Sequence, residues 1–297
     1  MPLVTTAELV SAAAARGHGV AAFNVITLEH AEAIAEGAER AGAPAILQIS
    51  ENAVRFHGGR LTAVAAATAA VARAAAVPLA LHLDHVESAE LLRAAPAEGF
   101  SSVMFDASKL PYAENLKATA EAVRWGHDHG VWIEAELGAV GGKEGDGGPG
   151  DGGGPALDAH APGVRTDPAE AAVFVAETGV DALAVAVGSS HAMTRRTAVL
   201  DHTLVAALRE AVPVPLVLHG SSGVPDEEIR RAVAAGMVKV NVGTALNTAF
   251  TEAVRAHLAA RPATVDPRKY LVPAREAMAG TVAGFLRVVG APEAPGT

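Results

Sequence analysis

The chain has 297 residues, half of them hydrophobic, with a formal net charge of −10 and no cysteine. This charge argues against nucleic acid or an anionic membrane as a partner, because both require clustered Lys and Arg. The lack of cysteine excludes disulfides and thiolate metal sites, so any transition metal must be held by His and carboxylate side chains.

The N-terminal segment predicts an amphipathic helix rather than a targeting signal. Residues 5–17, TTAELVSAAAARG, begin at a capping threonine and end at a glycine. No stretch of the chain approaches the roughly 20 apolar residues that a membrane span needs. We therefore expect a soluble, cytoplasmic protein.

Short apolar segments alternate along the chain with Ala-rich helical segments. The eight strand candidates are residues 20–24, 45–50, 79–84, 102–106, 131–137, 182–188, 215–220 and 238–242. Apolar strands separated by helices are typical of a parallel sheet buried on both faces. They predict a single domain over 1–297, an α/β protein with a closed (β/α)8 TIM barrel. An open doubly wound sheet is the alternative, but no Gly-rich phosphate turn follows the first strand.

Polar residues or glycine stand at the carboxyl ends of the predicted strands. They are Asn24, Ser50, Asp84 with His85, Asp106, Glu134 with Glu136, Gly188, His219 and Asn241. Barrel enzymes build their active sites at this end of the strands. The pattern therefore predicts an enzyme site there.

One segment, residues 138–163, is so rich in glycine that it supports neither a helix nor a strand. We predict a flexible active-site loop after strand five, because long loops beside barrel mouths often close over substrate. The alternative is a surface insertion without a role.

Three of the twelve histidines, His85, His191 and His219, follow predicted strands three, six and seven on the same face. Three neutral imidazoles with an open fourth position form the geometry of a catalytic zinc site. His82 shares one side of its strand with Asp84 and is expected behind the metal ligands. The remaining histidines fall in helices or loops, where solvated positions are expected: His18, His30, His57, His127, His129, His160, His202 and His257.

Asp84 is the candidate general acid or base, because it adjoins His85 and would reach a substrate oxygen. Alternatively, its carboxylate orients one of the histidines. Asp106 and Glu136 are candidates for an alternative or second metal position. Glu134 lies in the same register as Glu136 and would equally suit a buried ion pair.

Small-residue turns follow the last two predicted strands, HGSSGVP at 219–225 and NVGT at 241–244. Backbone N–H groups of such turns bind phosphate, and this corner is the usual phosphate site of these barrels. A metal, a carboxylate and a phosphate site together suit an enzyme that polarises a ketone and breaks the adjacent C–C bond.

These motifs resemble the class II, metal-dependent ketose-bisphosphate aldolases, the family of fructose- and tagatose-bisphosphate aldolases. The resemblance runs from AFN through LHLDH, EAELG and VLHG to KVN and the tail DPRKYL, which is nearly the whole chain. It implies a lyase of glycolysis or related carbohydrate metabolism. Such an enzyme reversibly cleaves a ketose 1,6-bisphosphate to dihydroxyacetone phosphate and an aldehyde such as glyceraldehyde 3-phosphate.

The resemblance also implies roles for single residues. Zn2+, or another divalent metal, would be held by His85, His191 and His219. Asp84 would exchange a proton with the C4 hydroxyl, and Glu144 in the mobile loop would exchange one with the dihydroxyacetone-phosphate carbon. A Na+ or K+ ion would lie near Gly188. Substrate and phosphate would contact Asn24, Ser50, Gly188, Ala192, Gly220, Ser221, Ser222, Asn241, Val242, Gly243 and Thr244.

The sequence departs from the family pattern at Ala192, Met193, Ser221, Gly243 and Ala245. The first two stand where glycine and an aromatic residue usually follow the histidine, and the last two where fructose-type members carry acidic residues. Arg195 or Arg196 would supply a missing cation nearby. These changes leave the metal ligands intact, but they leave open the sugar and whether it carries two phosphates.

Other functions stay open from the residues alone. One is a Schiff-base aldolase that uses Lys239 of strand eight, and another is a class II-type aldolase for a non-bisphosphate sugar. A metal-dependent hydrolase would need no phosphate turns, and a noncatalytic partner of another aldolase would not need Asp84. By analogy, we expect a homo-oligomer, a dimer or a tetramer, whose small-molecule partner is a phosphorylated sugar.

Overall fold

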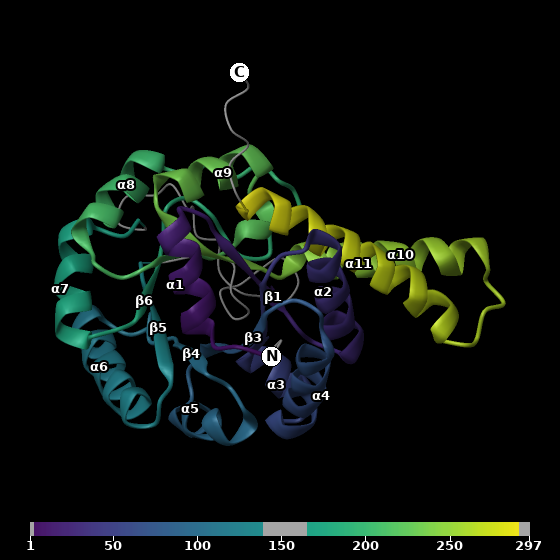
Figure 1. Cartoon of the computed structure of the whole chain (residues 1–297), viewed down its shortest axis with the longest axis horizontal. Coiled ribbons are helices and arrows are strands. Elements are labelled where there is room, and N and C mark those ends of the chain that lie inside the picture. Colours follow the sequence, from purple (N-terminus) through teal and green to yellow (C-terminus); the bar gives the residue numbers. More distant parts are fainter. Residues whose placement is uncertain (1–2, 139–164, 291–297) are drawn as a thin grey trace.

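A computed structural model describes residues 3–138 and 165–290 of the chain. Eight parallel strands form a closed barrel in which each strand pairs with the next and β8 pairs with β1 (Figure 1). The strands are β1 (Val20–Asn24), β2 (Ala45–Ser50), β3 (Leu79–Val86), β4 (Ser102–Phe105), β5 (Trp132–Leu137), β6 (Ala182–Val185), β7 (Leu216–Leu218) and β8 (Met237–Val242). The predicted TIM barrel is confirmed.

Helices lie around the barrel between successive strands, and two further helices, α10 and α11, follow β8 and extend away from the barrel where they connect (Figure 1). They are α2 (Leu28–Ala41), α3 (Glu51–Phe56), α4 (Leu61–Ala74), α5 (Ala89–Ala94), α6 (Tyr112–Asp128), α7 (Pro168–Thr178), α8 (His202–Ala211), α9 (Asp226–Ala235), α10 (Thr244–Ala260) and α11 (Arg268–Val289), with the 3-10 turns η1 (Pro96–Glu98) and η2 (Ser221–Gly223). In the part of the chain that the structure describes, no helix is both long and apolar enough to span a membrane.

Helix α1 (Thr6–Arg16) covers the amino-terminal end of the barrel. It begins with a capping box between Thr5 and Glu8 and ends at Gly17, whose φ of 68° is left-handed. Its apolar face packs on inward side chains from the starts of four strands: Val20, Ile46, Ala80 and Val238. The helix therefore closes the end of the barrel opposite the predicted site.

Alternation along β3 separates the core from the site. Leu81 and Leu83 point outward into the main hydrophobic core, where the strands pack on the surrounding helices. Ala80 packs inside the barrel, and the next two inward side chains are His82 and Asp84, both buried. The strand thus carries its polar groups toward the carboxyl end of the barrel interior.

Strands β6 and β7 are shorter than predicted. The backbone of Ala186 bonds to Thr166 instead of the neighbouring strand, at 2.8 and 3.1 Å. Beyond β7, Gly220 has a φ of 66°, which turns the chain out of the sheet. The residues after both strands therefore form loops at the mouth of the barrel.

One histidine differs from the sequence expectation. His30 is buried and not solvated, because its ring stacks on Phe250 with 5.6 Å between ring centroids. Its Nδ1 lies 3.3 Å from the backbone nitrogen of Thr27 at the start of α2, so it caps that helix.

Candidate active site

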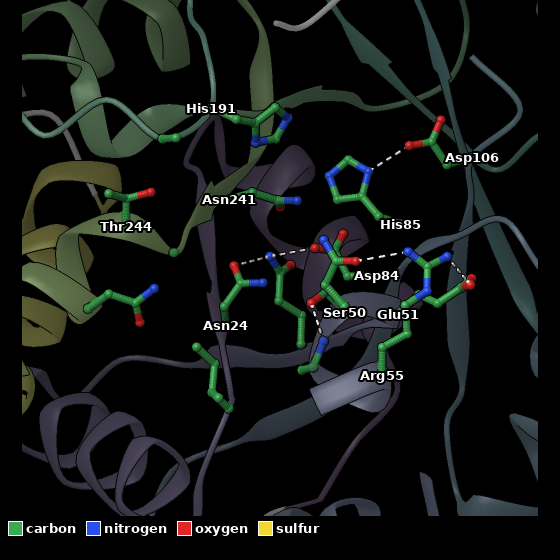
Figure 2. Close-up of a pocket in the computed structure, with 18 of the residues that line it drawn as sticks. Asn24, Ser50, Glu51, Arg55, Asp84, His85, Asp106, His191, Asn241 and Thr244 are labelled. Atoms are coloured by element: carbon green, nitrogen blue, oxygen red, sulfur yellow. Dashed lines mark hydrogen bonds and ion pairs between the residues drawn. The ribbon is translucent and has the colours of Figure 1, made fainter. Parts of the chain in front are cut away.

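A cavity of about 430 Å³ opens at the carboxyl ends of the strands (Figure 2). The predicted site residues that line it are Asn24, Ser50, Asp84, His85, Asp106, His191, Ala192, Gly220, Ser222, Asn241, Gly243 and Thr244. Gly188, Ser221 and Val242 are buried and are not part of the cavity wall. The structure therefore brings most of the predicted residues to one place.

A bulge in β3 brings two neighbouring residues to the cavity. The pairing register with β4 shifts between Leu83 and Val86. His85, within this bulge, has a φ of 47°, which is rare for a residue with a side chain. Strict alternation would point Asp84 inward and His85 outward, and the bulge instead lets both line the cavity.

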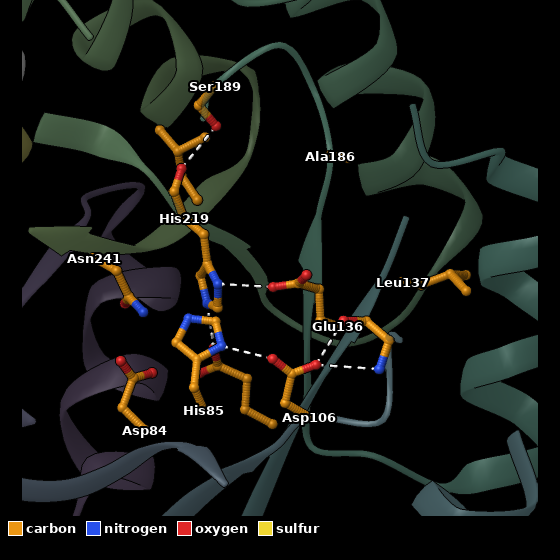
Figure 3. Close-up of polar contacts among 12 residues, drawn as sticks. Asp84, His85, Asp106, Glu136, Leu137, Ala186, Ser189, His219 and Asn241 are labelled. Carbon is orange, nitrogen blue, oxygen red and sulfur yellow. Dashed lines mark hydrogen bonds and ion pairs between the residues drawn. The ribbon is translucent and has the colours of Figure 1, made fainter. Parts of the chain in front are cut away.

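Three histidines come together at the cavity. His85 and His191 line it (Figure 2), and the fully buried His219 lies next to His85 (Figure 3). The ring centroids of His85 and His219 are 4.9 Å apart, those of His85 and His191 5.1 Å, and those of His191 and His219 5.7 Å. Glu136 joins them, and one ligand atom from each of the four residues lies within 4.8 Å of the others. This donor set matches the imidazole and carboxylate ligands of a divalent transition metal.

Carboxylates orient two of these rings. Asp106 Oδ2 lies 2.8 Å from His85 Nδ1, which leaves Nε2 of that ring toward the cluster. Glu134 Oε1 lies 3.0 Å from His219 Nε2, while Glu136 Oε2 lies 3.0 Å from His219 Nδ1. Asp106 thus supports a ligand, and Glu136 is the carboxylate placed within the cluster itself.

Below the histidines, Lys239 and Glu134 form a fully buried ion pair of 2.8 Å. Lys239 also donates to Asn241 Oδ1 at 2.8 Å. His82 is equally buried, with its Nδ1 2.8 Å from Ser102 Oγ and its Nε2 3.9 Å from Glu134 Oε2. The expected ion pair of Glu134 is confirmed, and Lys239 does not line the cavity.

The charges of this network shift the pKa values of its members, among them Asp84 and His219. Burial raises the pKa of the Asp84 carboxyl, but His85 and Lys239 lower it by more, so it lies below its ordinary value. Burial lowers the pKa of His219, and its hydrogen bonds to Glu134 and Glu136 raise it by more, to about 9. Asp84 is therefore ionised at neutral pH, and the carboxylates around His219 favour a cation there.

Gln48 is a site residue that the sequence analysis missed. It is buried, and its Nε2 donates to Asp84 Oδ2 at 3.2 Å and to Asn24 Oδ1 at 2.9 Å. Asp84 Oδ1 is buried without a hydrogen-bond partner among the described residues, so it is available to a ligand. The available signal was a glutamine inside the apolar segment AILQIS.

The turns after β7 and β8 form another part of the cavity wall. A Cβ at Gly220 would come within 2.5 Å of Ser190 O, and one at Gly243 within 2.8 Å of Asn24 Oδ1. Ser222 Oγ accepts a hydrogen bond from Ala245 N at 3.0 Å, which ties the two turns together. The absence of a side chain at these glycines therefore lets the two turns pack closely against Ser190 and Asn24.

Comparison with known proteins now identifies the family. A family model described as fructose-bisphosphate aldolase class-II matches residues 4–293. The chain belongs to the class II fructose-bisphosphate aldolase family. It is therefore a class II aldolase, an enzyme of the lyase class.

Relatives within this aldolase family cover nearly the whole chain. The probable fructose-bisphosphate aldolase of Bacillus subtilis (strain 168) is 41% identical over 292 residues, which are 98% of each chain. The fructose-bisphosphate aldolase of Geobacillus stearothermophilus is 40% identical with the same coverage. The crystal structure of the YdjI aldolase from Escherichia coli K12 is 30% identical, has a TM-score of 0.81 and matches over 97% of each chain.

The family departures around His191 have a structural basis. Ala192 has a φ of 57°, the left-handed conformation in which glycine is usual. Met193 packs over Gly223, where a Cβ would lie 2.4 Å from Met193 Cβ. Arg196 donates to Val224 O and lies 5.0 Å from the centroid of the Phe285 ring. Neither Arg195 nor Arg196 lines the cavity, so the structure does not place the expected replacement cation there.

The predicted aldolase loop lies mostly outside the described residues. Of the segment 138–163, the structure describes Gly138 alone, and Glu144 is among the residues it does not describe. The role of this loop and of Glu144 therefore stays a prediction.

Proposed function

We propose that this aldolase cleaves a ketose 1,6-bisphosphate of the fructose or tagatose type to dihydroxyacetone phosphate and an aldehyde such as glyceraldehyde 3-phosphate. The observation that carries the proposal is the convergence of three imidazoles and Glu136 beside the ionised Asp84, at one end of a cavity that also contains the small-residue turns. The names of the family relatives support the same substrate class.

The residues present fit a divalent metal, and Zn2+ is the ion we propose. His85, His191 and His219 supply nitrogen donors, and Asp106 fixes one of their rings. Glu136, in contact with His219, is placed to serve as a further or alternative ligand. The metal would supply Lewis-acid polarisation of the substrate ketone. The proposed Na+ or K+ ion near Gly188 would support phosphate binding.

Asp84 is the proposed acid/base group for the sugar hydroxyl. In the cleavage direction it accepts the C4 hydroxyl proton while the C3–C4 bond breaks, which turns C4 into the aldehyde. Its depressed pKa keeps the carboxylate ready to accept that proton at neutral pH. Gln48 holds one carboxylate oxygen and leaves Oδ1 to the substrate.

The phosphate of dihydroxyacetone phosphate would lie on the wall formed after β7 and β8. Gly220, Ser222, Gly243 and Thr244 line the cavity there, and small residues leave their backbone N–H groups accessible to an anion. Glu144 would exchange a proton with the dihydroxyacetone-phosphate carbon. Ser221 and Val242 are buried next to residues of this wall, and their proposed contact with the phosphate would be made from that position.

Of two alternatives, the site supports the first less well and fits the second equally. A Schiff-base aldolase needs an accessible lysine amine, whereas Lys239 is buried in its contacts with Glu134 and Asn241. A class II-type aldolase for a non-bisphosphate sugar would use the same metal and acid/base groups, so only substrate preference separates it from the main proposal. We further propose a single-domain, cytoplasmic enzyme that assembles as a dimer or tetramer.

Two substitutions test the proposed roles. Asp84→Asn should keep the metal and lower cleavage by about a hundredfold or more, because it removes proton transfer but not a ligand. His219→Ala should remove bound metal and activity together, since it deletes one of three imidazoles. Metal content by elemental analysis and aldol cleavage by a coupled assay separate the cases. Full metal content in His219→Ala, or full turnover in Asp84→Asn, would contradict the assignment.

A further inference from the structure

Lys239 is a buried charge for which the proposed reaction has no direct use. Its side chain is fully buried, and its ammonium lies 2.8 Å from Glu134 Oε2 and donates to Asn241 Oδ1, also at 2.8 Å. A buried ammonium is costly unless acceptors replace the water that it has lost. Asn241 is one of these acceptors and also lines the cavity. Lys239 therefore connects the interior of the barrel to a residue of the site.

An irregularity in β8 places Lys239 on the same face as Asn241. The pairing of β8 with β7 moves from Met237 directly to Lys239, so Val238 is passed over. Val238 packs on α1 inside the barrel, and strict alternation would point the next side chain outward. Lys239 nevertheless points inward, as its contact with Glu134 shows, and alternation from there brings Asn241 inward above it.

The ammonium fixes which way the Asn241 amide faces. Because a lysine ammonium has three donors and no acceptor, the amide atom that faces it must be the oxygen. The amide nitrogen then points away from Lys239, and in both close-ups it points toward His85 (Figure 2, Figure 3). Asn241 Nδ2 is buried and has no hydrogen-bond partner among the residues that the structure describes. It is an oriented donor at the cavity that has no acceptor within the protein.

A substrate bound as proposed above would pass this donor. With the first phosphate at the turns after β7 and β8 and the C4 hydroxyl at Asp84, carbons two and three lie between them, and Asn241 belongs to the same cavity wall. When the C3–C4 bond breaks, its electron pair passes to C3 and the oxygen on C2 gains negative charge, while Asp84 takes the C4 hydroxyl proton. An N–H donor aimed at that oxygen stabilises the transition state, whereas an amide oxygen there would repel it.

We propose that Lys239 is a positioning residue, which holds the Asn241 amide with Nδ2 toward the oxygen on C2 of the substrate. This inference rests on the proposed function. Lys239 acts through Asn241 and not on the substrate itself, because it does not line the cavity. Without the ammonium the amide is free to turn. The loss then falls on kcat rather than on substrate binding, since the negative charge develops in the transition state.

The first test measures kcat and KM of Lys239→Met in the zinc-loaded enzyme with fructose 1,6-bisphosphate. The value of kcat should fall by about tenfold or more, while KM stays within about twofold of the wild-type value, because an oriented donor acts chiefly in the transition state. The zinc content should stay at the wild-type level. Lys239→Gln should recover part of kcat, since its amide offers two N–H donors to the same two acceptors.

A double-mutant cycle shows whether Lys239 acts through Asn241. Asn241→Ala alone should lower kcat, and adding Lys239→Met to it should lower kcat no further. An equal fall in both backgrounds would overturn the inference, because Lys239 would then act through Glu134 on His219.

Asn241→Asp tests the donor with Lys239 in place, and it decides the question even if Lys239→Met does not fold. The carboxylate keeps an acceptor for the ammonium but lacks the N–H donor, so kcat should fall as it does in Asn241→Ala. A wild-type kcat in Asn241→Asp would overturn the inference.

Ser102→Ala is the matched control inside the barrel. Ser102 is buried and bonds to His82 and Thr6, and its hydrogen bonds in the described part of the chain do not include Asn241. This variant should keep the wild-type kcat. A fall as large as that of Lys239→Met, or an unchanged kcat in Lys239→Met, would overturn the inference and leave aldol cleavage by the wild-type enzyme intact. If the wild-type enzyme cleaves neither fructose nor tagatose 1,6-bisphosphate, the proposed function itself fails.

Discussion

Two residues of the cavity wall have backbone conformations that L-amino acids rarely adopt. Among the described residues other than glycine, positive φ occurs at His85, with 47°, and at Ala192, with 57°. His85 belongs to the histidine cluster and Ala192 directly follows His191 of that cluster, and each conformation costs on the order of 1–2 kcal/mol. The fold is therefore less stable by this amount in return for the observed positions of these side chains. Such strained backbone conformations cluster at active sites.

Replacing Ala192 by glycine should relieve this strain. We expect Ala192→Gly to raise the free energy of unfolding by roughly 0.5–1 kcal/mol, the strain relieved less the extra entropy of glycine in the unfolded chain. Urea unfolding of the metal-free protein measures this change. Ala75→Gly, at an ordinary φ of −64°, is the control and should be destabilising. Equal destabilisation by both substitutions would rule out strain at Ala192.

His82 should make the protein less stable in acid. Burial, with the charge of Lys239, lowers the pKa of His82 to about 3. Above pH 6.5 the imidazole is neutral in both folded and unfolded states, so it has no effect there. As the pH falls below 6.5, the unfolded chain binds a proton that the folded state resists, which costs about 2 kcal/mol at pH 5.

The variant His82→Asn tests this pH dependence, because an amide replaces the imidazole beside Ser102 without a titratable group. Urea unfolding between pH 7 and 5, with EDTA present so that metal release does not contribute, should show a shallower loss of stability in the variant. Parallel curves for the two proteins would show that His82 is protonated as easily in the folded state as in the unfolded one.

At the scale of strands and helices, sequence periodicity predicted the barrel well and the site in part. Alternation correctly placed His82 and Asp84 on the inward face of β3. It gave no reason for His85 to follow them, because the bulge that turns this residue depends on pairing with β4. Arg55 of α3, which lines the cavity, was not predicted for a similar reason, since its place in the cavity wall depends on how α3 packs beside β3.

Close packing between helices is a second feature that the helix propensities of single residues do not predict. Helix α2 lies along α11 (Figure 1). Gly37 of α2 faces that contact, and a Cβ there would lie 2.6 Å from both Ala279 O and Val282 Cβ. Helix propensity alone favours alanine at this position by about 1 kcal/mol, but the close approach of the two helices opposes it.

We expect Gly37→Ala to destabilise the protein by about 1–3 kcal/mol, because the added methyl group forces the helices apart. Gly280→Ala on α11 is the matched control: no atom lies within 4 Å of its added Cβ, so helix propensity should stabilise the protein by up to about 1 kcal/mol. Thermal or urea unfolding of both variants measures the two effects. If Gly37→Ala stabilised the protein as Gly280→Ala does, the α2–α11 contact would have to accommodate the added methyl group at little cost.

At the scale of the whole molecule, closing the sheet makes the site possible. Histidines that lie 134 residues apart in the chain, at 85 and 219, come to 4.9 Å between ring centroids because β3 and β7 belong to one barrel. Helix α1 fills the opposite end with apolar side chains. The chain carries a net charge of −10, so an anionic sugar phosphate must be bound by local groups rather than by the overall field.

The most direct test of metal-dependent aldol cleavage compares fructose 1,6-bisphosphate and tagatose 1,6-bisphosphate, each with and without EDTA and after zinc is added back. We predict cleavage that EDTA abolishes and zinc restores, and the faster sugar identifies the substrate. Cleavage that resists EDTA would contradict the metal mechanism and direct attention to Lys239. Failure to cleave either sugar with zinc present would contradict the proposed substrate class.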